Sequence, residues 1–191
     1  MSLPLVFGTT LDTVPGAVPY LSANSSDVQR WNDRFSETIQ GLRVGLVWAG
    51  GGNHQKDRAR SLRLADFAGL ANVPGVTFFT LQRGDPAIQA ASPPMGMRLI
   101  DWTEHLHDFA DTAAMLSHLD LVITVDTSVG HLAGAMGKPV WTLLAFAPDW
   151  RWLLDREDSP WYPRTRLFRQ KSPGDWADPL ARLAVELQKR T

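Results

Sequence analysis

The chain has 191 residues, a hydrophobic content of 44% and a formal net charge of −1, which suits one well-buried globular domain and leaves little material for a second core. Its 19 basic and 20 acidic side chains give no basic excess for binding nucleic acid or an anionic membrane. The lack of cysteine excludes disulfides and thiolate metal sites, and no apolar run approaches the ~20 residues of a membrane span. We therefore expect a cytoplasmic protein.

Residues 1–41 are expected to form a linker and one helix. Prolines and glycines without any sustained period make residues 4–24 an extended connecting segment. Ser25, Ser26 and Asp27 are suited to cap a helix that runs to about Gln40, whose apolar side chains recur every three or four residues. We predict that this region is the tail of a preceding half and that residues 42–191 form the folded domain.

From residue 42 onward, predicted strands alternate with predicted helices. Short apolar runs indicate strands at 43–48, 76–81, 98–100, 121–125, 140–144 and 166–168. Apolar periodicity and cap residues indicate helices at 62–71, at 112–118 with Asp111 as cap, at 127–136, and from Asp175 or Asp178 to the end, with a loop at 84–97. Because most of the strands are apolar throughout, the pattern predicts an α/β fold with an open, Rossmann-like parallel sheet covered by helices on both faces.

Ligands of such sheets bind beyond the carboxyl ends of the strands. The segments expected at that edge are 50–61, 82–85, 101–102 and 126–131. We therefore predict that they converge on one crevice.

The run from Asp126 to His131 is the main candidate for ligand binding. It joins a predicted strand to a predicted helix, and a helix start offers free N–H groups and a positive dipole end to a diphosphate. On this basis Thr127, Ser128, Val129 and Gly130 are candidates for binding a ligand such as a diphosphate. Asp126 is suited either to sugar hydroxyls or to capping the helix, and His131 either reaches a phosphate or acts as a structural tether.

The second candidate is the loop that begins at Gly50, Gly51 and Gly52. It has neither the spacing of a dinucleotide fingerprint nor that of a P-loop. The glycines allow close approach of a ligand, but a surface turn has the same composition. Arg58 and Arg60 follow, and their guanidinium groups suit a phosphate, or alternatively a solvated face.

No metal site is predicted. His105 and His107 lie next to Asp108, but no further ligand follows them at a recognisable spacing. The sequence has no G-x-S-x-G motif of a serine nucleophile, and Ser128 lies in a run better suited to donating backbone N–H groups.

The sequence DTSVGHLAGAMGKPV at 126–140 resembles the donor-site motif of family 9 glycosyltransferases, the heptosyltransferase-like enzymes. Five further segments resemble the glycosyltransferase-like region that follows tetratricopeptide repeats in many bacterial proteins. They are GLVWAGG at 45–51, RSL at 60–62, LQRG at 81–84, DWRW at 149–152 and SPWYP at 159–163. The resemblance covers about residues 42–190.

The resemblance implies the carboxyl-terminal half of a GT-B glycosyltransferase, which holds a nucleotide-diphosphate sugar without a cofactor. It implies that Asp126 contacts the sugar, that Thr127, Ser128 and the following amides bind the diphosphate, and that the loop from Arg58 to Ser61 approaches phosphate or sugar. By position alone, Gln82 and Asp101-Trp102 are expected on the nucleoside side. The family usually has Gly at the position of Ser128 and a lysine in the first loop, for which Lys56 is the nearest counterpart.

The expected chemistry is metal-independent glycosyl transfer, in which helix amides and arginines stabilise the departing diphosphate. The acceptor must also lose a proton to a base, and in the family that base comes from the amino-terminal half. We therefore expect hexosyl or heptosyl transfer only when the chain is joined to an acceptor half. Two alternatives remain: a non-catalytic nucleotide- or sugar-binding or scaffold module of a tetratricopeptide-repeat protein, and a nucleotide-sugar epimerase or hydrolase.

Overall fold

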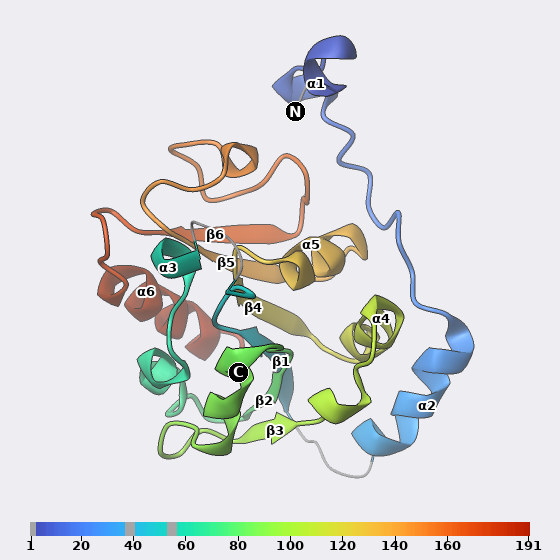
Figure 1. The fold of residues 1–191 in the computed structure, drawn as a ribbon, viewed down its shortest axis with the longest axis vertical. Coiled ribbons are helices and arrows are strands. Elements are labelled where there is room, and N and C mark those ends of the chain that lie inside the picture. The colour runs from blue at the N-terminus through green and yellow to red at the C-terminus, as the bar shows by residue number, and fades with distance from the viewer. Residues whose placement is uncertain (1–2, 37–40, 53–56) are drawn as a thin grey trace.

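A computed structural model describes residues 3–36, 41–52 and 57–191. Its centre is a six-stranded parallel sheet with the order β3-β2-β1-β4-β5-β6 (Figure 1). The strands are β1 (Leu42–Val47), β2 (Val76–Thr80), β3 (Leu99–Asp101), β4 (Leu121–Val125), β5 (Val140–Leu144) and β6 (Thr165–Arg169). This is the strand order of a dinucleotide-binding Rossmann fold, so the predicted α/β class and open parallel sheet are confirmed.

Helices cover both faces of the sheet (Figure 1). The α-helices are α1 (Leu3–Val6), α2 (Ser25–Ser36), α3 (Asp57–Arg60), α4 (Phe109–Ser117), α5 (Ser128–Ala135) and α6 (Ala177–Gln188). The 3₁₀ helices are η1 (Leu11–Thr13), η2 (Leu64–Leu70), η3 (Asp85–Ala91), η4 (Thr103–His105) and η5 (Trp150–Trp152).

The two faces of β4 serve two separate apolar cores. Leu121, Ile123 and Val125 pack on the side covered by α6 and η2. Val122 packs on the opposite side, with α2, α4 and α5. Both kinds of side chain are fully buried, which explains why this strand is apolar except at Thr124 and does not alternate between apolar and polar residues.

Helix α2 packs against α4 through two aromatic side chains. Trp31 is 5% exposed and Phe35 is 1% exposed, and the Phe35 ring lies 5.0 Å from that of Phe79 in β2. The predicted helix is therefore present from Ser25 to Ser36, and it completes the core instead of standing apart from it. Its predicted continuation to Gln40 falls outside the described residues, and the predicted boundary at residue 41 stays a prediction.

The segment before α2 is largely extended, as expected, but contains the short helices α1 and η1. It lies along the outside of the molecule (Figure 1). The backbone N–H groups of Tyr20 and Leu21 both donate to the carbonyl of Ala135, at 3.0 and 3.3 Å. These bonds fix the segment before α2, which we call the amino-terminal arm, to the end of α5.

Two predicted elements differ from the structure. Asp111 was expected to cap the helix before β4, but α4 begins at Phe109 because the Asp108 carboxylate accepts hydrogen bonds from the N–H groups of Ala110 and Asp111. The loop predicted at 84–97 contains the 3₁₀ helix η3, where proline follows the first residue.

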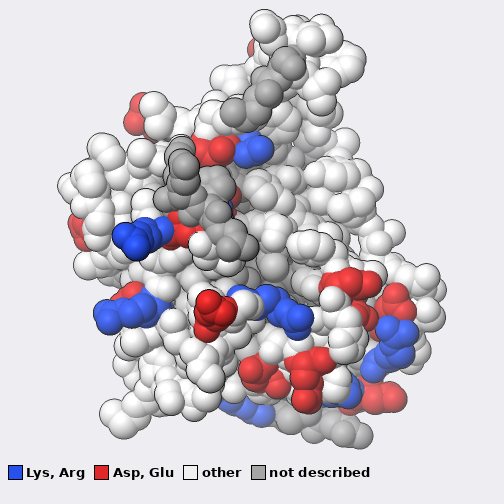
Figure 2. All heavy atoms as spheres, in the orientation of Figure 1, with Lys and Arg blue, Asp and Glu red and all other residues white. Residues whose placement is uncertain are grey.

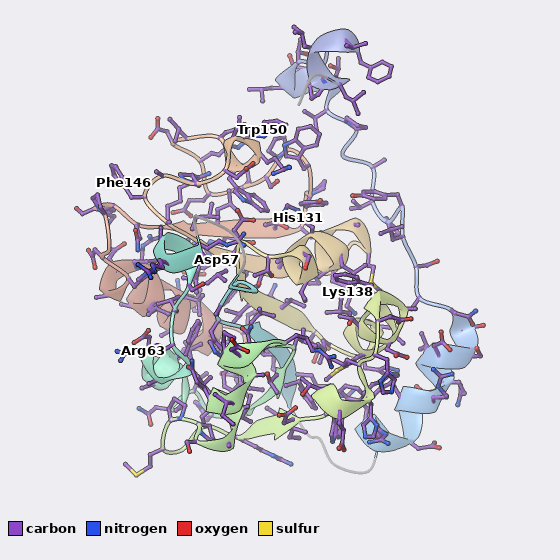
Figure 3. All side chains as sticks on the ribbon, viewed as in Figure 1. Asp57, Arg63, His131, Lys138, Phe146 and Trp150 are labelled. Carbon is purple, nitrogen blue, oxygen red and sulfur yellow. The ribbon has the colours of Figure 1, made fainter. Side chains whose placement is uncertain are left out.

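The surface carries charges of both signs. Figure 2 shows acidic and basic side chains interspersed over the face drawn. Large apolar side chains are exposed after β5, where Phe146 is 52% and Trp150 is 40% exposed (Figure 3). Among the helices of the described chain, none has the length and apolar character required to cross a membrane.

Gly45 lies in the middle of β1. Replacing it tests how tightly the core on the side of α2, α4 and α5 is packed. A Cβ atom there would lie 2.7 Å from Leu81 Cδ1 and 2.8 Å from Leu119 Cδ1. We expect Gly45→Ala to lower the free energy of unfolding by about 1–3 kcal/mol, because both leucines are buried. Urea unfolding measures this change.

Gly69→Ala is the matched control, because a Cβ atom at this position in η2 meets nothing within 4 Å. It should leave stability unchanged or slightly higher. Equal stability of the Gly45 and Gly69 variants would show that the core beside β1 has free space.

Candidate donor-binding site

A cavity of about 700 Å³ lies where the strand order reverses, at the carboxyl ends of β1 and β4. These strands are neighbours, with Val47 beside Thr124, so the loops after them meet. The volume lies in the range of small-molecule and cofactor sites. Its walls come from segments distant in sequence: 47–51, 59–60, 81–83, 106–112, 126–131 and 144–151.

The amino terminus of α5 faces this cavity without a side-chain cap. Thr127 has the extended backbone of a cap residue, but its side chain makes no capping hydrogen bond. Its hydroxyl instead lies 2.9 Å from that of Thr124. Thr127, Ser128 and Val129 line the cavity, so the first N–H groups of α5 are directed to a site where an anion fits.

Gly130 has a different position from the one expected. It does not line the cavity, and a Cβ atom on it would lie 2.8 Å from Thr124 Cγ2. The glycine lets α5 pack closely on β4, which sets the direction of the helix.

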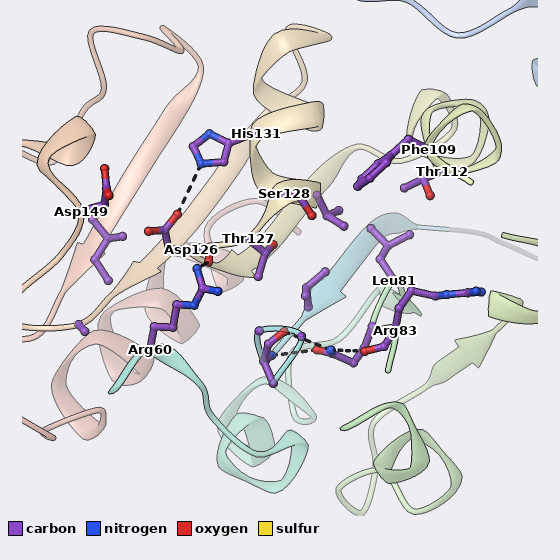
Figure 4. A pocket seen from close by; sticks show the side chains of 18 of the residues that line it. Arg60, Leu81, Arg83, Phe109, Thr112, Asp126, Thr127, Ser128, His131 and Asp149 are labelled. Atoms are coloured by element: carbon purple, nitrogen blue, oxygen red, sulfur yellow. Dashed lines mark hydrogen bonds and ion pairs between the residues drawn. The ribbon is translucent and has the colours of Figure 1, made fainter. Parts of the chain in front are cut away.

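The carboxylate of Asp126 does not cap α5. It faces His131, whose Nε2 lies 3.6 Å from Asp126 Oδ1 (Figure 4). Burial would raise the pKa of Asp126, but the N–H groups of His131 and Trp152 near the carboxylate and the positive charge of Arg60 outweigh it, so the pKa is lower than usual. The Trp152 indole approaches the carboxylate, although its N–H makes no hydrogen bond of regular geometry. Asp126 therefore presents an ionised carboxylate to the cavity.

Arg60 is in the cavity wall and is already held by protein groups. Its Nε and Nη2 donate to Asp57 Oδ1 at 2.8 and 2.5 Å, and its Nη1 donates to the carbonyl of Asp126 at 2.6 Å. The guanidinium has five N–H groups, and within the described part of the chain two of them are left for a ligand. Arg60 thus joins α3 to the turn after β4 and keeps positive charge beside the α5 amino terminus.

The glycine triplet divides into two parts. Gly50 and Gly51 line the cavity, whereas Gly52 is exposed and does not. Ser61 also lies outside the lining, but its Oγ accepts a hydrogen bond from Gly50 N at 3.0 Å. Ser61 therefore shapes the loop that the glycines form.

Neither of the two remaining basic candidates of this loop is found among the described residues that line the cavity. Arg58 is exposed and lies outside the lining. Lys56, the expected counterpart of the family's loop lysine, lies outside the described residues.

Gln82, expected on the nucleoside side, lines the cavity but serves the backbone. Its Oε1 accepts from the N–H groups of Trp48 and Ala49, and its Nε2 donates to the carbonyls of Ala49 and Arg83. The side chain is buried. It fixes the end of β1 to the end of β2 and has no free donor.

Trp102 does not line the cavity. Its ring packs 5.8 Å from Trp31 and 5.1 Å from Phe35, because a large apolar ring gains more from the core than from the crevice. The cavity wall across from Asp126 instead contains Arg83 and Phe109 (Figure 4). His107 also lines the cavity.

The sequence analysis expected segment 82–85, which contains Arg83, at the crevice, but it missed His107 and Phe109. Phe109 is 55% exposed, which is unusual for a phenylalanine at the start of a helix. The signal available was Asp108, since a cap at 108 places Phe109 at the beginning of α4, beside the crevice.

No group of three or more metal-binding side chains is found in residues 3–36, 41–52 and 57–191. His105 lies near Glu104, at 3.2 Å, and His107 is part of the cavity wall.

The stretch from the start of α4 to the end of β6 decides which family the site resembles. Residues 107–173 match glycosyltransferase family 9 (heptosyltransferase). This stretch includes Asp126, the uncapped start of α5 and His131. The resemblance that the motif indicated is therefore confirmed there.

Relatives of this chain are longer than the chain itself. Protein FlbA of Caulobacter vibrioides is 28% identical over 186 residues, which are 94% of this chain and 30% of FlbA. The E. coli ADP-heptose LPS heptosyltransferase II has the same fold, with a TM-score of 0.63 at 15% identity, over 92% of this chain and 55% of that chain. The family 9 glycosyl transferase from Veillonella parvula gives 0.63 at 12% identity, over 96% and 57%. The chain thus spans just over half of the two solved structures.

Asp126→Asn tests the ionised carboxylate. A carboxyl whose pKa is lowered on folding stabilises the protein above its unfolded pKa, near 3.8, and that contribution is lost as the pH falls through the lower folded value. We therefore expect the wild-type protein to lose stability below about pH 4 more steeply than the variant. Urea unfolding from neutral pH down to about pH 3 measures the difference.

Asp85→Asn, at an exposed position, is the control and should follow the wild-type profile. If the Asp126 variant also follows that profile, the carboxylate is not preferentially stabilised in the folded protein.

Proposed function

We propose that this chain binds a nucleotide-diphosphate sugar in the crevice at the carboxyl ends of β1 and β4, as the donor-binding half of a glycosyltransferase. The observation that carries the proposal is the uncapped amino terminus of α5, which opens into a cavity opposite Gly50 and Gly51. Free amides at a helix start suit a diphosphate, and small residues opposite leave room for it.

Each part of the donor has a matching part of the cavity. The diphosphate lies at the start of α5, where the two free N–H groups of Arg60 add charge. The sugar lies beside Asp126 and His131, whose polar atoms suit hydroxyl groups. The nucleoside lies toward Phe109 and Arg83, since an exposed ring offers a stacking surface.

The proposed chemistry is glycosyl transfer, in which the α5 amides and Arg60 stabilise the departing diphosphate without a metal. The chain spans 55% and 57% of the two solved structures described above. We propose that the acceptor and the base that deprotonates it belong to a second half, with or without tetratricopeptide repeats. The chain alone should then bind donor with little turnover.

Isothermal calorimetry with adenosine, guanosine and uridine diphosphate sugars tests donor binding. The E. coli relative is named for ADP-heptose, so an ADP-sugar is the first to try. Turnover by the parent protein separates an enzyme from a scaffold module. Absence of binding by every member of the panel, with the fold intact, would remove the proposal.

Ser128→Glu is the sharpest test of the diphosphate position. The side chain is exposed in the first turn of α5 and lines the cavity, so a carboxylate there repels a diphosphate. We expect donor affinity to fall at least about tenfold, while stability is kept because a negative charge suits a helix start. Calorimetry and thermal melting measure the two quantities.

Ser25→Glu is the matched control, because Ser25 is the exposed first residue of α2 and does not line the cavity. It should bind the donor like the wild-type protein. Full affinity in the Ser128 variant would place the diphosphate elsewhere.

Asp126→Ala separates sugar binding from nucleotide binding. If the carboxylate holds sugar hydroxyls, affinity for the nucleotide sugar falls about tenfold, as expected for a charged hydrogen bond, while affinity for the nucleoside diphosphate changes little. An equal loss for both ligands would assign Asp126 to the shape of the turn instead.

A further inference from the structure

The aromatic side chains of His131, Trp152 and Tyr162 form a cluster next to Asp126. This cluster joins the cavity to the amino-terminal arm through Tyr20. The His131 ring stacks on Trp152, with centroids 5.3 Å apart and an angle of 15° between the planes. The other edge of the imidazole meets Tyr162, whose hydroxyl lies 3.1 Å from His131 Nδ1. Tyr162 belongs to the segment between η5 and β6 and does not line the cavity.

The protonation states of Asp126 and Tyr162 determine which tautomer a neutral imidazole between them adopts. Asp126 is ionised and only accepts hydrogen bonds. Burial raises the pKa of Tyr162, so its hydroxyl keeps its proton. A neutral His131 therefore places its N–H on Nε2, toward Asp126, and accepts the Tyr162 proton at Nδ1.

Packing leaves the Tyr162 ring little freedom. A Cβ atom on Gly134 would lie 2.6 Å from Tyr162 Cγ, so the ring lies directly against the backbone of α5. Trp152 lies 6.5 Å from it on another side, and Tyr20 forms a side-chain hydrogen bond with it. Gly134 and His131 lie about one turn apart in α5. Packing of the ring on Gly134 therefore holds the hydroxyl of Tyr162 at a fixed position relative to His131.

We propose that Tyr162 is a positioning residue of the donor site, whose hydroxyl donates to His131 Nδ1 and so aims the His131 Nε2–H at Asp126 and at a sugar oxygen bound beside it. Tyr162 does not touch the donor and acts through His131. This role rests on the proposed function for its effect on the sugar, whereas the state of the imidazole exists in the ligand-free protein. It is the role of an outer hydrogen-bond partner that fixes the tautomer and direction of a histidine.

The first experiment needs no ligand. ¹⁵N NMR of histidine-labelled protein at alkaline pH, where imidazole is neutral, reports which ring nitrogen carries the proton and whether the other accepts a hydrogen bond. The His131 signals are assigned by their loss in His131→Gln. We expect an unprotonated, hydrogen-bonded Nδ1 in the wild-type protein, and in Tyr162→Phe a shift of Nδ1 toward that of an unbonded nitrogen.

Tyr20→Phe is the matched control. The chain has only two tyrosines, and this substitution removes the hydroxyl of Tyr20 while it leaves that of Tyr162 in place. It should leave the His131 signals close to those of the wild-type protein. A protonated Nδ1 in the wild-type protein would overturn the proposal, and so would identical His131 signals in wild type and Tyr162→Phe.

The second experiment measures donor binding by calorimetry. We expect Tyr162→Phe to weaken binding of the nucleotide sugar about three- to tenfold, the size of one neutral hydrogen bond, and to change the affinity for the nucleoside diphosphate less. A purely structural role would weaken both ligands equally and lower the melting temperature, which would count against positioning.

The two proposals fail in different ways. If the wild-type protein binds no nucleotide sugar while the NMR signature of Nδ1 is present, the proposed function is overturned and the hydrogen bond stands. If the wild-type protein binds the sugar but Nδ1 is protonated, the function stands and the role of Tyr162 is overturned.

Discussion

The reversal of strand order between β1 and β4 is the constraint on which the site depends. Because the chain continues outward from β1 in both directions, the connections on the two sides leave a crevice at the carboxyl ends of these neighbouring strands. The loop with Gly50 and the start of α5 meet there. Any ligand in the crevice therefore contacts backbone from two distant parts of the sequence.

Several polar side chains at this crevice hold the backbone before they meet any ligand. Gln82 uses its amide to tie β1 to β2, and Arg60 ties α3 to the carbonyl of Asp126. Because these contacts already hold the loops in place, a ligand loses less free energy in ordering them when it binds. Among the described residues, the groups available to a ligand include the first amides of α5 and two N–H groups of Arg60.

The sequence predicted the sheet well because buried parallel strands are apolar throughout, and β4 and β5 were expected at their observed bounds. It also predicted that Asp126, Thr127 and Ser128 lie at the cavity. It was less successful where one residue type serves two purposes. A tryptophan at position 102 is suited either to stack on a nucleoside or to pack in the core. Its contacts with Trp31 and Phe35 show that it packs in the core. Asp108 and Asp111 are both good caps, and hydrogen-bond geometry decides between them.

The contact between Gly134 and Tyr162 has a consequence for how this protein changes over evolutionary time. The ring occupies the space that any side chain at 134 would need, and the same ring carries the hydroxyl next to His131. A mutation that enlarges position 134 is thus tolerated only with a smaller residue at 162. Lineages that lose the tyrosine are freed to acquire alanine or serine at 134, so the two positions should covary among homologues.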